Sequence, residues 1–271
     1  MLTNIASPCP PTLSEPTRTR FVIKYTGYVY HLRETLMYWL HKRLLSQNFL
    51  VNRELVKKLV RGSSISASDT VLEIGSGTGT ITCELLQITP HVIPIEKDPK
   101  LTNHPQDFLT FSLPKTPYKV FSNIPYSITG AIVRKLLLAS NPPQDCYLIM
   151  QSEAAAKFMI QPKANTMAAV LYYPIWDIRT IHHFARTDFS PIPAVDSVLV
   201  HFTPRSLVTN KSAYQDFIAH QFTHNKLAKF VSPTQYLKLF AHHDPRLSHG
   251  SFARLSRLQS LLPHHPRVTR Y

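Results

Sequence analysis

The chain has 271 residues, of which 44% are hydrophobic, so it is long enough to bury a core, with one larger and one smaller domain expected. Its 30 Lys and Arg residues exceed its 16 Asp and Glu residues and give a formal charge of +14, which favours binding to a polyanion. No apolar stretch reaches the ~20 residues that a membrane-spanning helix requires, so the sequence excludes a protein that crosses a bilayer.

Residues 1–41 are rich in proline, serine and threonine, a composition typical of poorly ordered chain. We expect a flexible, basic N-terminal extension. Three interpretations of it are open: an arm that contacts RNA, a mitochondrial transit peptide, or residues upstream of a true translation start at Met37. The expected location is the cytoplasm, with mitochondria as the alternative if the extension is a transit peptide.

A strand, a glycine-rich turn and a helix are predicted between residues 71 and 87. The apolar run at 71–74 leads into Gly75-Ser76-Gly77-Thr78-Gly79, and a helical pattern follows at 80–87. Glycine allows positive φ and lets the backbone approach a ligand closely. This layout is typical of a nucleotide-binding turn.

A second apolar run, at 91–95, ends at Glu96. A carboxylate roughly 20 positions after the first glycine is well placed to bind a ribose diol. The glycine spacing departs from the dinucleotide fingerprint Gly-x-Gly-x-x-Gly, and no P-loop Lys-Ser/Thr follows. The expected cofactor is therefore S-adenosylmethionine, with S-adenosyl-L-homocysteine as its product.

The tetrapeptide Asn123-Ile124-Pro125-Tyr126 follows another apolar, strand-like run at 118–121. It combines a side-chain amide, a carbonyl fixed by the following proline and an aromatic ring. The amino group of a flat heterocycle has a delocalised lone pair, so an enzyme must hold it with acceptors while a ring stacks on the base. Asn123 and the Ile124 carbonyl can accept, and Tyr126 can stack.

Two further segments complete the pattern. A proline-stiffened loop at 189–197 begins with Phe189 and leads into an alternating strand at 198–202. Upstream, Ser46-Gln47-Asn48-Phe49-Leu50 precedes a short helical pattern at 53–60, which Gly62 can end.

With these motifs in this order, residues 45–204 resemble the ribosomal RNA adenine N6-dimethyltransferases. Ser76 in the glycine turn and Ile124 look more like the Erm-type enzymes, which modify an adenine of 23S rRNA and confer macrolide, lincosamide and streptogramin B resistance. The small-subunit (16S) enzymes, the first alternative, more often carry Pro and Leu at these positions. Two more interpretations are open: a non-catalytic relative such as a mitochondrial transcription factor, and an enzyme acting on DNA adenine.

The resemblance implies residue roles. The base is expected to contact Asn123, Ile124, Tyr126 and Phe189. Cofactor contacts are expected from Gln47, Asn48, Leu50, Glu73, Gly75, Ser76, Gly77, Gly79, Glu96, Asp107 and Asn123. The segment between Glu96 and Asp107 is too short for the helix and strand that family members place before such an acidic residue. Either the sheet lacks an edge strand and the pocket is more open, or the chain is degenerate and binds cofactor poorly.

The expected fold is α/β: a Rossmann-like class I methyltransferase with a mostly parallel, seven-stranded-type sheet that can lack one strand. The methyltransferase domain is expected at 42–205, and a small helical RNA-binding domain at 206–271. Further strands are predicted at 146–150 and near 168–178, with helices at 129–139, 153–159, 214–230, 234–242 and 251–262. Alternating strands and helices indicate helices on both faces of the sheet.

The three cysteines and the His-His pairs fall in no metal-ligand spacing, so no metal is expected. The expected partner is ribosomal RNA, bound by a monomer without a membrane.

Overall fold

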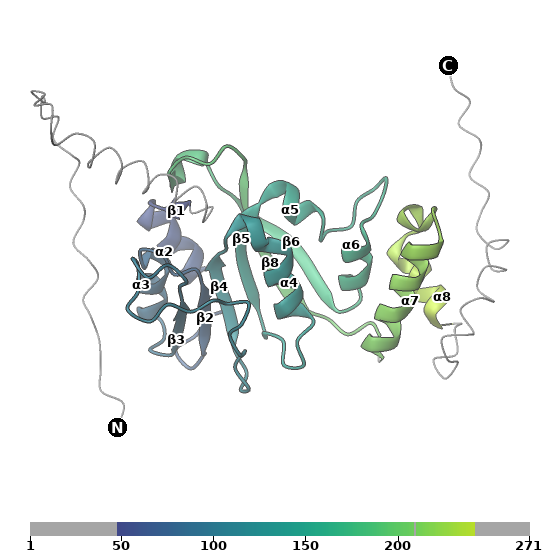
Figure 1. The fold of residues 1–271 in the computed structure, drawn as a ribbon, viewed down its shortest axis with the longest axis horizontal. Coiled ribbons are helices and arrows are strands. Elements are labelled where there is room, and N and C mark those ends of the chain that lie inside the picture. The colour runs from purple at the N-terminus through teal and green to yellow at the C-terminus, as the bar shows by residue number, and fades with distance from the viewer. Residues whose placement is uncertain (1–47, 209, 242–271) are drawn as a thin grey trace, which may run out of the picture. The chain divides into compact units, whose positions relative to one another are not determined.

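The computed structural model describes residues 48–208 and 210–241. Within them, a six-stranded sheet has the order β3-β2-β4-β5-β8-β6 (Figure 1). Its parallel part consists of β3 (Val92–Ile95), β2 (Val71–Ile74), β4 (Lys119–Asn123) and β5 (Cys146–Gln151). β8 (Ser197–Pro204) pairs antiparallel with β5, and β6 (Trp176–His183) is the strand beyond it. The Rossmann-like α/β fold predicted from the sequence is confirmed.

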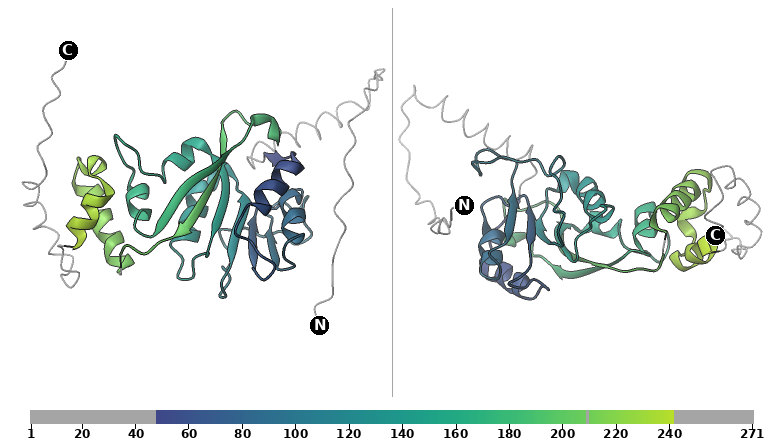
Figure 2. Two further views of the ribbon diagram at one scale, coloured as in Figure 1. Left: turned by 180° about the vertical axis from the view of Figure 1, so that it is seen from behind. Right: turned by 90° about the horizontal axis from the view of Figure 1, so that it is seen from below.

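Helices lie on both faces of this sheet (Figures 1 and 2). On one face, α2 (Arg53–Arg61) and α3 (Thr80–Leu86) share a buried hydrophobic cluster with strand residues such as Phe121 and Leu199. On the other, α4 (Thr129–Leu137) buries four hydrophobic side chains of its inner surface. Since strand side chains alternate between the faces, both faces of the parallel strands are apolar.

The turns after β2 and β4 lie next to each other. β3 pairs with one edge of β2 and β4 with the other, so the strand order reverses at β2. The paired residues of β2 and β4 are Val71 with Lys119 and Leu72 with Val120, near the start of both strands. Ligands of open α/β sheets bind at the carboxyl ends of strands where the order reverses, so a site is expected after β2 and β4.

A small second sheet pairs two distant segments. β1 (Phe49–Leu50) runs antiparallel to β7 (Phe189–Ser190). The Val51 amide donates to the Asp188 carbonyl over 2.9 Å, and Asn52 Nδ2 donates to Asp188 Oδ1 over 2.9 Å. These contacts fix the segment before α2 against the loop that leads into β8.

The segment at 97–117 contains no helix or strand. It follows β3, which is the edge strand on that side of the sheet. The sheet therefore lacks the additional edge strand, which agrees with the first of the two alternatives raised by the short spacing between Glu96 and Asp107.

The described residues form two compact units, 48–155 with 179–203 and 156–178 with 204–241. The second unit contains α6 (Met167–Tyr172), α7 (Lys211–His224), the 3-10 turn η3 (Ala228–Phe230) and α8 (Pro233–Ala241). It differs from the predicted C-terminal domain because it also includes 156–178. The reason is direct contact: the Tyr214 hydroxyl donates to the Val170 carbonyl over 3.1 Å, and the Asn165 amide donates to the Lys229 carbonyl over 2.7 Å.

One predicted strand was wrong. Residues near 168–178 form α6 and only then enter β6 at Trp176. Thr166 caps α6, because its side chain accepts the Ala169 amide over 3.0 Å. Pro174 follows the helix and cannot continue it. The C-terminal helix expected at 251–262 and the extension at 1–41 lie outside the described residues.

Candidate active site

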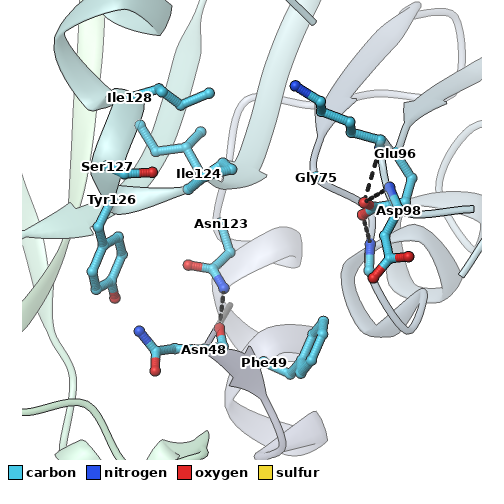
Figure 3. Close-up of a pocket in the computed structure, with 13 residues that line it drawn as sticks. Asn48, Phe49, Gly75, Glu96, Asp98, Asn123, Ile124, Tyr126, Ser127 and Ile128 are labelled. Atoms are coloured by element: carbon cyan, nitrogen blue, oxygen red, sulfur yellow. Dashed lines mark hydrogen bonds between the residues drawn. The ribbon is translucent and has the colours of Figure 1, made fainter. Parts of the chain in front are cut away.

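A cavity of about 240 Å³ lies at the carboxyl ends of β2 and β4, within the first compact unit (Figure 3). Four segments line it: Asn48 and Phe49, Gly75 and Gly77, residues 96–98, and residues 123–128. The structure thus brings together the glycine turn, the end of β3 and the Asn-Ile-Pro-Tyr turn, which the sequence predicted as parts of one site.

The glycine turn presents backbone rather than side chains to this cavity. Gly75 and Gly77 have φ values of +72° and +55°, which strain any other residue. A Cβ atom on Gly77 would lie 2.8 Å from Cε1 of Phe49, so no larger residue fits without moving that ring. The Gly75 amide donates to the Ile95 carbonyl over 2.7 Å, which ties the turn to the end of β3.

Glu96 is buried and is held by backbone amides alone. Its Oε2 accepts the Gly77 amide over 2.8 Å, and its Oε1 accepts the Lys97 and Asp98 amides, each over 2.8 Å. A carboxylate oxygen can accept about two hydrogen bonds, so Oε2 keeps capacity for a further donor. The side chain is thus fixed beside the glycine turn and can accept a ligand hydroxyl.

Glu73 lies beneath the site and does not line the cavity. It is 1% exposed, and its Oε2 accepts the Thr82 hydroxyl over 2.5 Å. Burial raises the pKa of the Glu73 carboxyl to about 8, the Thr82 hydrogen bond opposes this shift, and the nearby Glu96 adds to it. The group is therefore neutral at physiological pH in the folded protein, and its contribution is to support the turn.

Glu73 makes folding stability depend on pH. Its folded pKa of about 8 exceeds the ordinary value of 4.5, so unfolding releases a proton between these values and stability falls as pH rises through that window. Glu73→Gln removes the titrating group. We expect its melting temperature relative to wild type to increase steadily from pH 5 to pH 8 and then to level off. Thermal unfolding across this range checks it, with the exposed Glu54→Gln as the matched control, and parallel curves for Glu73→Gln and wild type would contradict it.

Asn123 is the amide of the predicted catalytic turn. Its Nδ2 donates to the Asn48 carbonyl over 2.7 Å (Figure 3). Since that carbonyl can only accept, the amide nitrogen must face it, which fixes the orientation of the side chain. Its Oδ1 is buried and has no hydrogen-bond partner among the described residues. Burial without a partner is costly, so this oxygen is an acceptor that awaits a donor.

Tyr126 stands at the same end of the cavity (Figure 3). Its hydroxyl and that of Ser197 share a hydrogen bond of 2.6 Å. Burial raises the pKa of the Tyr126 phenol, so it remains protonated and is no base. The Ile124 side chain is buried, and its amide donates to the Ile149 carbonyl over 3.2 Å, which anchors the turn to β5.

Phe189 occupies a different place from the one expected. It is 1% exposed, belongs to the core cluster and meets the Phe184 ring edge-on with centroids 5.4 Å apart. Phe189 is opposite Leu50 in the β1–β7 pair, and neither residue is among those that line the cavity. A base cannot stack on Phe189 in this conformation, because the pairing holds the ring in the core.

Asp107 also lies outside the cavity lining. Its Oδ2 forms an ion pair of 2.7 Å with Lys97 Nζ, and its Oδ1 accepts the Leu109 amide over 2.9 Å. The Lys97 contact and the Leu109 amide hold the pKa of Asp107 below its usual value. Lys97 itself lines the cavity, so it is this lysine, and not Asp107, that faces the site.

Other expected residues have mixed placements. Ser76 and Gly79 form the turn, with the Gly79 amide donating to the Ser76 carbonyl over 2.9 Å, but neither lines the cavity. Gln47 lies outside the described residues. Three cavity residues were not predicted from the sequence, although each is within two positions of a predicted one: Phe49, Lys97 and Asp98.

The part of the chain that the structure describes offers neither a metal centre nor a membrane span. Within it, no cluster of three or more His, Cys, Asp or Glu side chains is arranged to bind a metal ion. Among the same residues, no helix is both long and apolar enough to cross a bilayer.

Known proteins with similar sequences carry these motifs. A ribosomal RNA small subunit methyltransferase A of Chlorobium phaeobacteroides is 34% identical over 200 residues, which cover 67% of this chain and 74% of the relative. An rRNA adenine N-6-methyltransferase of Bacteroides fragilis is 32% identical over 196 residues, covering 66% of this chain and 73% of the relative.

Solved structures show the same fold. The 23S rRNA methyltransferase ErmE has a TM-score of 0.64 at 24% identity, covering 72% of this chain and 98% of ErmE. A dimethyladenosine transferase from Plasmodium falciparum has a TM-score of 0.61 at 22% identity, covering 79% of this chain and 89% of that one. The family model for ribosomal RNA adenine dimethylase matches residues 40–230. This chain therefore belongs to the ribosomal RNA adenine dimethylase family, a family of enzymes whose cofactor is S-adenosylmethionine.

Proposed function

We propose that this protein transfers methyl groups to the exocyclic N6 of an adenine in small-subunit rRNA and produces the dimethylated base. The observation that carries the proposal is the buried, unpartnered Asn123 Oδ1 beside Tyr126 at the cavity. The relatives favour small-subunit RNA, because several of those with 33–34% identity are named small subunit methyltransferases.

The chain's own groups suffice to hold the amine. Asn123 Oδ1 accepts one N–H of the adenine amino group, and the Ile124 carbonyl, fixed by Pro125, accepts the other. The Tyr126 ring stacks on the base and fixes its plane. When bound, S-adenosylmethionine supplies the electrophilic methyl group of its sulfonium. Rate then comes chiefly from proximity and orientation, without a strong base.

The cofactor is held by the residues around the glycine turn. Gly75 and Gly77 allow close approach of the backbone, Glu96 accepts the ribose hydroxyls through Oε2, and Phe49 and Asn48 close the cavity. Glu73, Leu50, Ser76 and Gly79 contribute from outside the lining by supporting these segments. The roles of Gln47 and Asp107 are carried over from the resemblance. Asp107 reaches a ligand only if its exposed ion pair with Lys97 opens, which costs about 0–1 kcal/mol.

The RNA substrate is expected to contact the C-terminal helical region, proposed as the RNA-binding domain at 206–271. Within its described part, basic residues such as Lys226 and Lys229 outnumber Asp216. Extrusion of a base costs a few kcal/mol in a duplex and less in a loop or junction, so we expect a looped target. The relatives named above are bacterial, which favours the cytoplasm as the place of action, and we propose that the protein acts as a monomer.

The second candidate is methylation of 23S rRNA by an Erm-type enzyme. Ser76 in the glycine turn and Ile124 in the Asn-Ile-Pro-Tyr turn favour it. It differs from the first proposal only in the RNA, because the chemistry at Asn123 and Tyr126 is the same.

A direct comparison of the two RNAs tests the proposal. Labelled methyl transfer from S-adenosylmethionine is measured on protein-free small-subunit and large-subunit rRNA in parallel, with Asn123→Ala as the control. We expect the small-subunit RNA to be labelled and the label to be lost in the variant. Labelling of large-subunit RNA alone would replace the proposal by the Erm-type candidate. No labelling by folded protein would favour a non-catalytic relative.

A further inference from the structure

Lys135 on α4 makes an unusual set of contacts with the segment that follows β3. Its Nζ donates to the carbonyls of Phe108, Leu109 and Phe111, over 2.6, 3.0 and 2.5 Å. The ammonium also lies 4.9 Å from the centroid of the Phe108 ring. All three N–H donors of the ammonium are thus directed to backbone carbonyls of one turn.

These contacts replace secondary structure that the segment lacks. Residues 97–117 contain no helix or strand, so few of their carbonyls have backbone partners. The turn closes on itself through Asp107, whose carbonyl accepts the amides of Thr110 and Phe111 over 3.1 and 3.0 Å. Lys135 supplies the connection from this turn to α4, with hydrogen bonds from a charged donor that are each worth about 1.5–3 kcal/mol.

The turn that Lys135 holds is joined to the cavity wall at two points. The Gln106 amide donates to the Glu96 carbonyl over 2.6 Å, and the Asp107 carboxylate pairs with Lys97 Nζ over 2.7 Å. Glu96 and Lys97 both line the cavity. The path from Lys135 to the wall therefore runs through adjacent residues, with a direct polar contact wherever it leaves the backbone.

We propose that Lys135 is a positioning residue for the cofactor: by holding the turn at 107–111, it keeps the wall at residues 96–98 in the shape that binds S-adenosylmethionine. The proposal rests on the function proposed above. α4 begins directly after the Asn-Ile-Pro-Tyr turn, so the same helix supports both the base-binding turn and the cofactor wall.

Two observations support it. Burial lowers the pKa of Lys135, and the nearby Asp107 opposes this shift, so the ammonium is enclosed next to the turn and not merely a surface charge. Asn141, just beyond α4, provides a natural comparison. Its Nδ2 donates to the Pro114 and Thr116 carbonyls of the same segment, over 2.9 and 3.1 Å, but at the end away from residues 106–107.

Calorimetric titration of the full-length protein with S-adenosylhomocysteine tests the proposal. For Lys135→Met, the loss of charged hydrogen bonds is expected to raise the Kd about tenfold. The rate of methyl transfer at saturating S-adenosylmethionine should stay within about twofold of wild type, since base-holding groups are untouched. Lys135→Arg, which keeps several donors, should restore most of the affinity. Asn141→Ala, which loosens the same segment at its far end, should leave the Kd unchanged.

The outcomes separate the two proposals. Wild-type affinity in Lys135→Met overturns the role of Lys135 alone, as does an equal loss in Asn141→Ala, which would indicate general loosening. A wild-type protein that does not bind S-adenosylhomocysteine overturns both this role and the proposed function. If Lys135→Met does not fold, Lys135→Gln takes its place, and the expected order of affinity is wild type, Arg, Gln; any other order contradicts the proposal.

Discussion

Asn123→Ala and Tyr126→Ala are each expected to reduce methyl transfer by about 100-fold or more, the scale seen when an oriented polar group is removed from an active site. Asn123→Ala removes the acceptor Oδ1, and Tyr126→Ala removes the ring on which the base stacks. Neither residue holds the glycine turn or Glu96. The Kd for S-adenosylmethionine should therefore change by no more than about threefold. Single-turnover rates and calorimetric titration of each variant separate these effects.

Two controls make this result specific. Asn141→Ala also removes an amide that donates to backbone carbonyls, but from outside the cavity, and should transfer methyl groups at the wild-type rate. Tyr126→Phe loses the hydrogen bond to Ser197 but keeps the ring, so it should retain most activity if stacking is the role of this residue. Substantial activity in both Asn123→Ala and Tyr126→Ala would refute the mechanism.

Gly77→Ala should weaken cofactor binding more than any other single change near the glycine turn. Alanine at a φ of +55° costs about 1–2 kcal/mol in backbone strain. In addition, its Cβ would lie 2.8 Å from Phe49 Cε1, so the ring must move within the cavity that it lines. Because 1.4 kcal/mol corresponds to a factor of ten, we expect the Kd for S-adenosylmethionine to rise by about tenfold or more, measured by calorimetry.

Gly130→Ala is the matched glycine control. Gly130 lies in the first turn of α4, and a Cβ atom added there would meet no heavy atom within 4 Å beyond its own helix backbone and chain neighbours. Alanine favours a helix by up to about 1 kcal/mol over glycine, so this variant should melt at a slightly higher temperature and bind cofactor normally. If Gly77→Ala bound S-adenosylmethionine as wild type does, the cofactor would not lie against this turn.

The sequence predicted the site best where chemistry and local structure coincide. Gly75, Glu96 and Asn123 lie at or directly beyond the carboxyl ends of three neighbouring parallel strands, so a correct strand assignment was enough to bring them together. Phe49 could not be predicted in the same way. Its position over Gly77 depends on the pairing of β1 with β7, which joins segments about 140 residues apart.

The same pairing explains the unexpected place of Phe189. A proline-stiffened loop does fix this ring, but the strand register opposite Leu50 directs it into the core instead of the cavity. The strand near 168–178 was predicted from apolar content alone, which does not distinguish a short buried helix from a strand. The Thr166 cap and Pro174 were the signals for the helix that forms there.

The short segment after Glu96 is compatible, by sequence, with either an open pocket or a degenerate one. The structure has a sheet without the extra edge strand, and a cavity still lies beside Glu96. What the sequence could not show is that a lysine on a following helix holds the segment in place, because the three carbonyls bound by Lys135 lie 24 to 27 positions before it.

Nucleoside mass spectrometry of rRNA treated with the full-length protein and S-adenosylmethionine tests the central claim most directly. We predict that N6,N6-dimethyladenosine forms with wild-type protein, in small-subunit rRNA, and is absent with Asn123→Ala. No methylated adenosine in either rRNA from a protein that binds S-adenosylmethionine, or methylation at an atom other than N6, would contradict it.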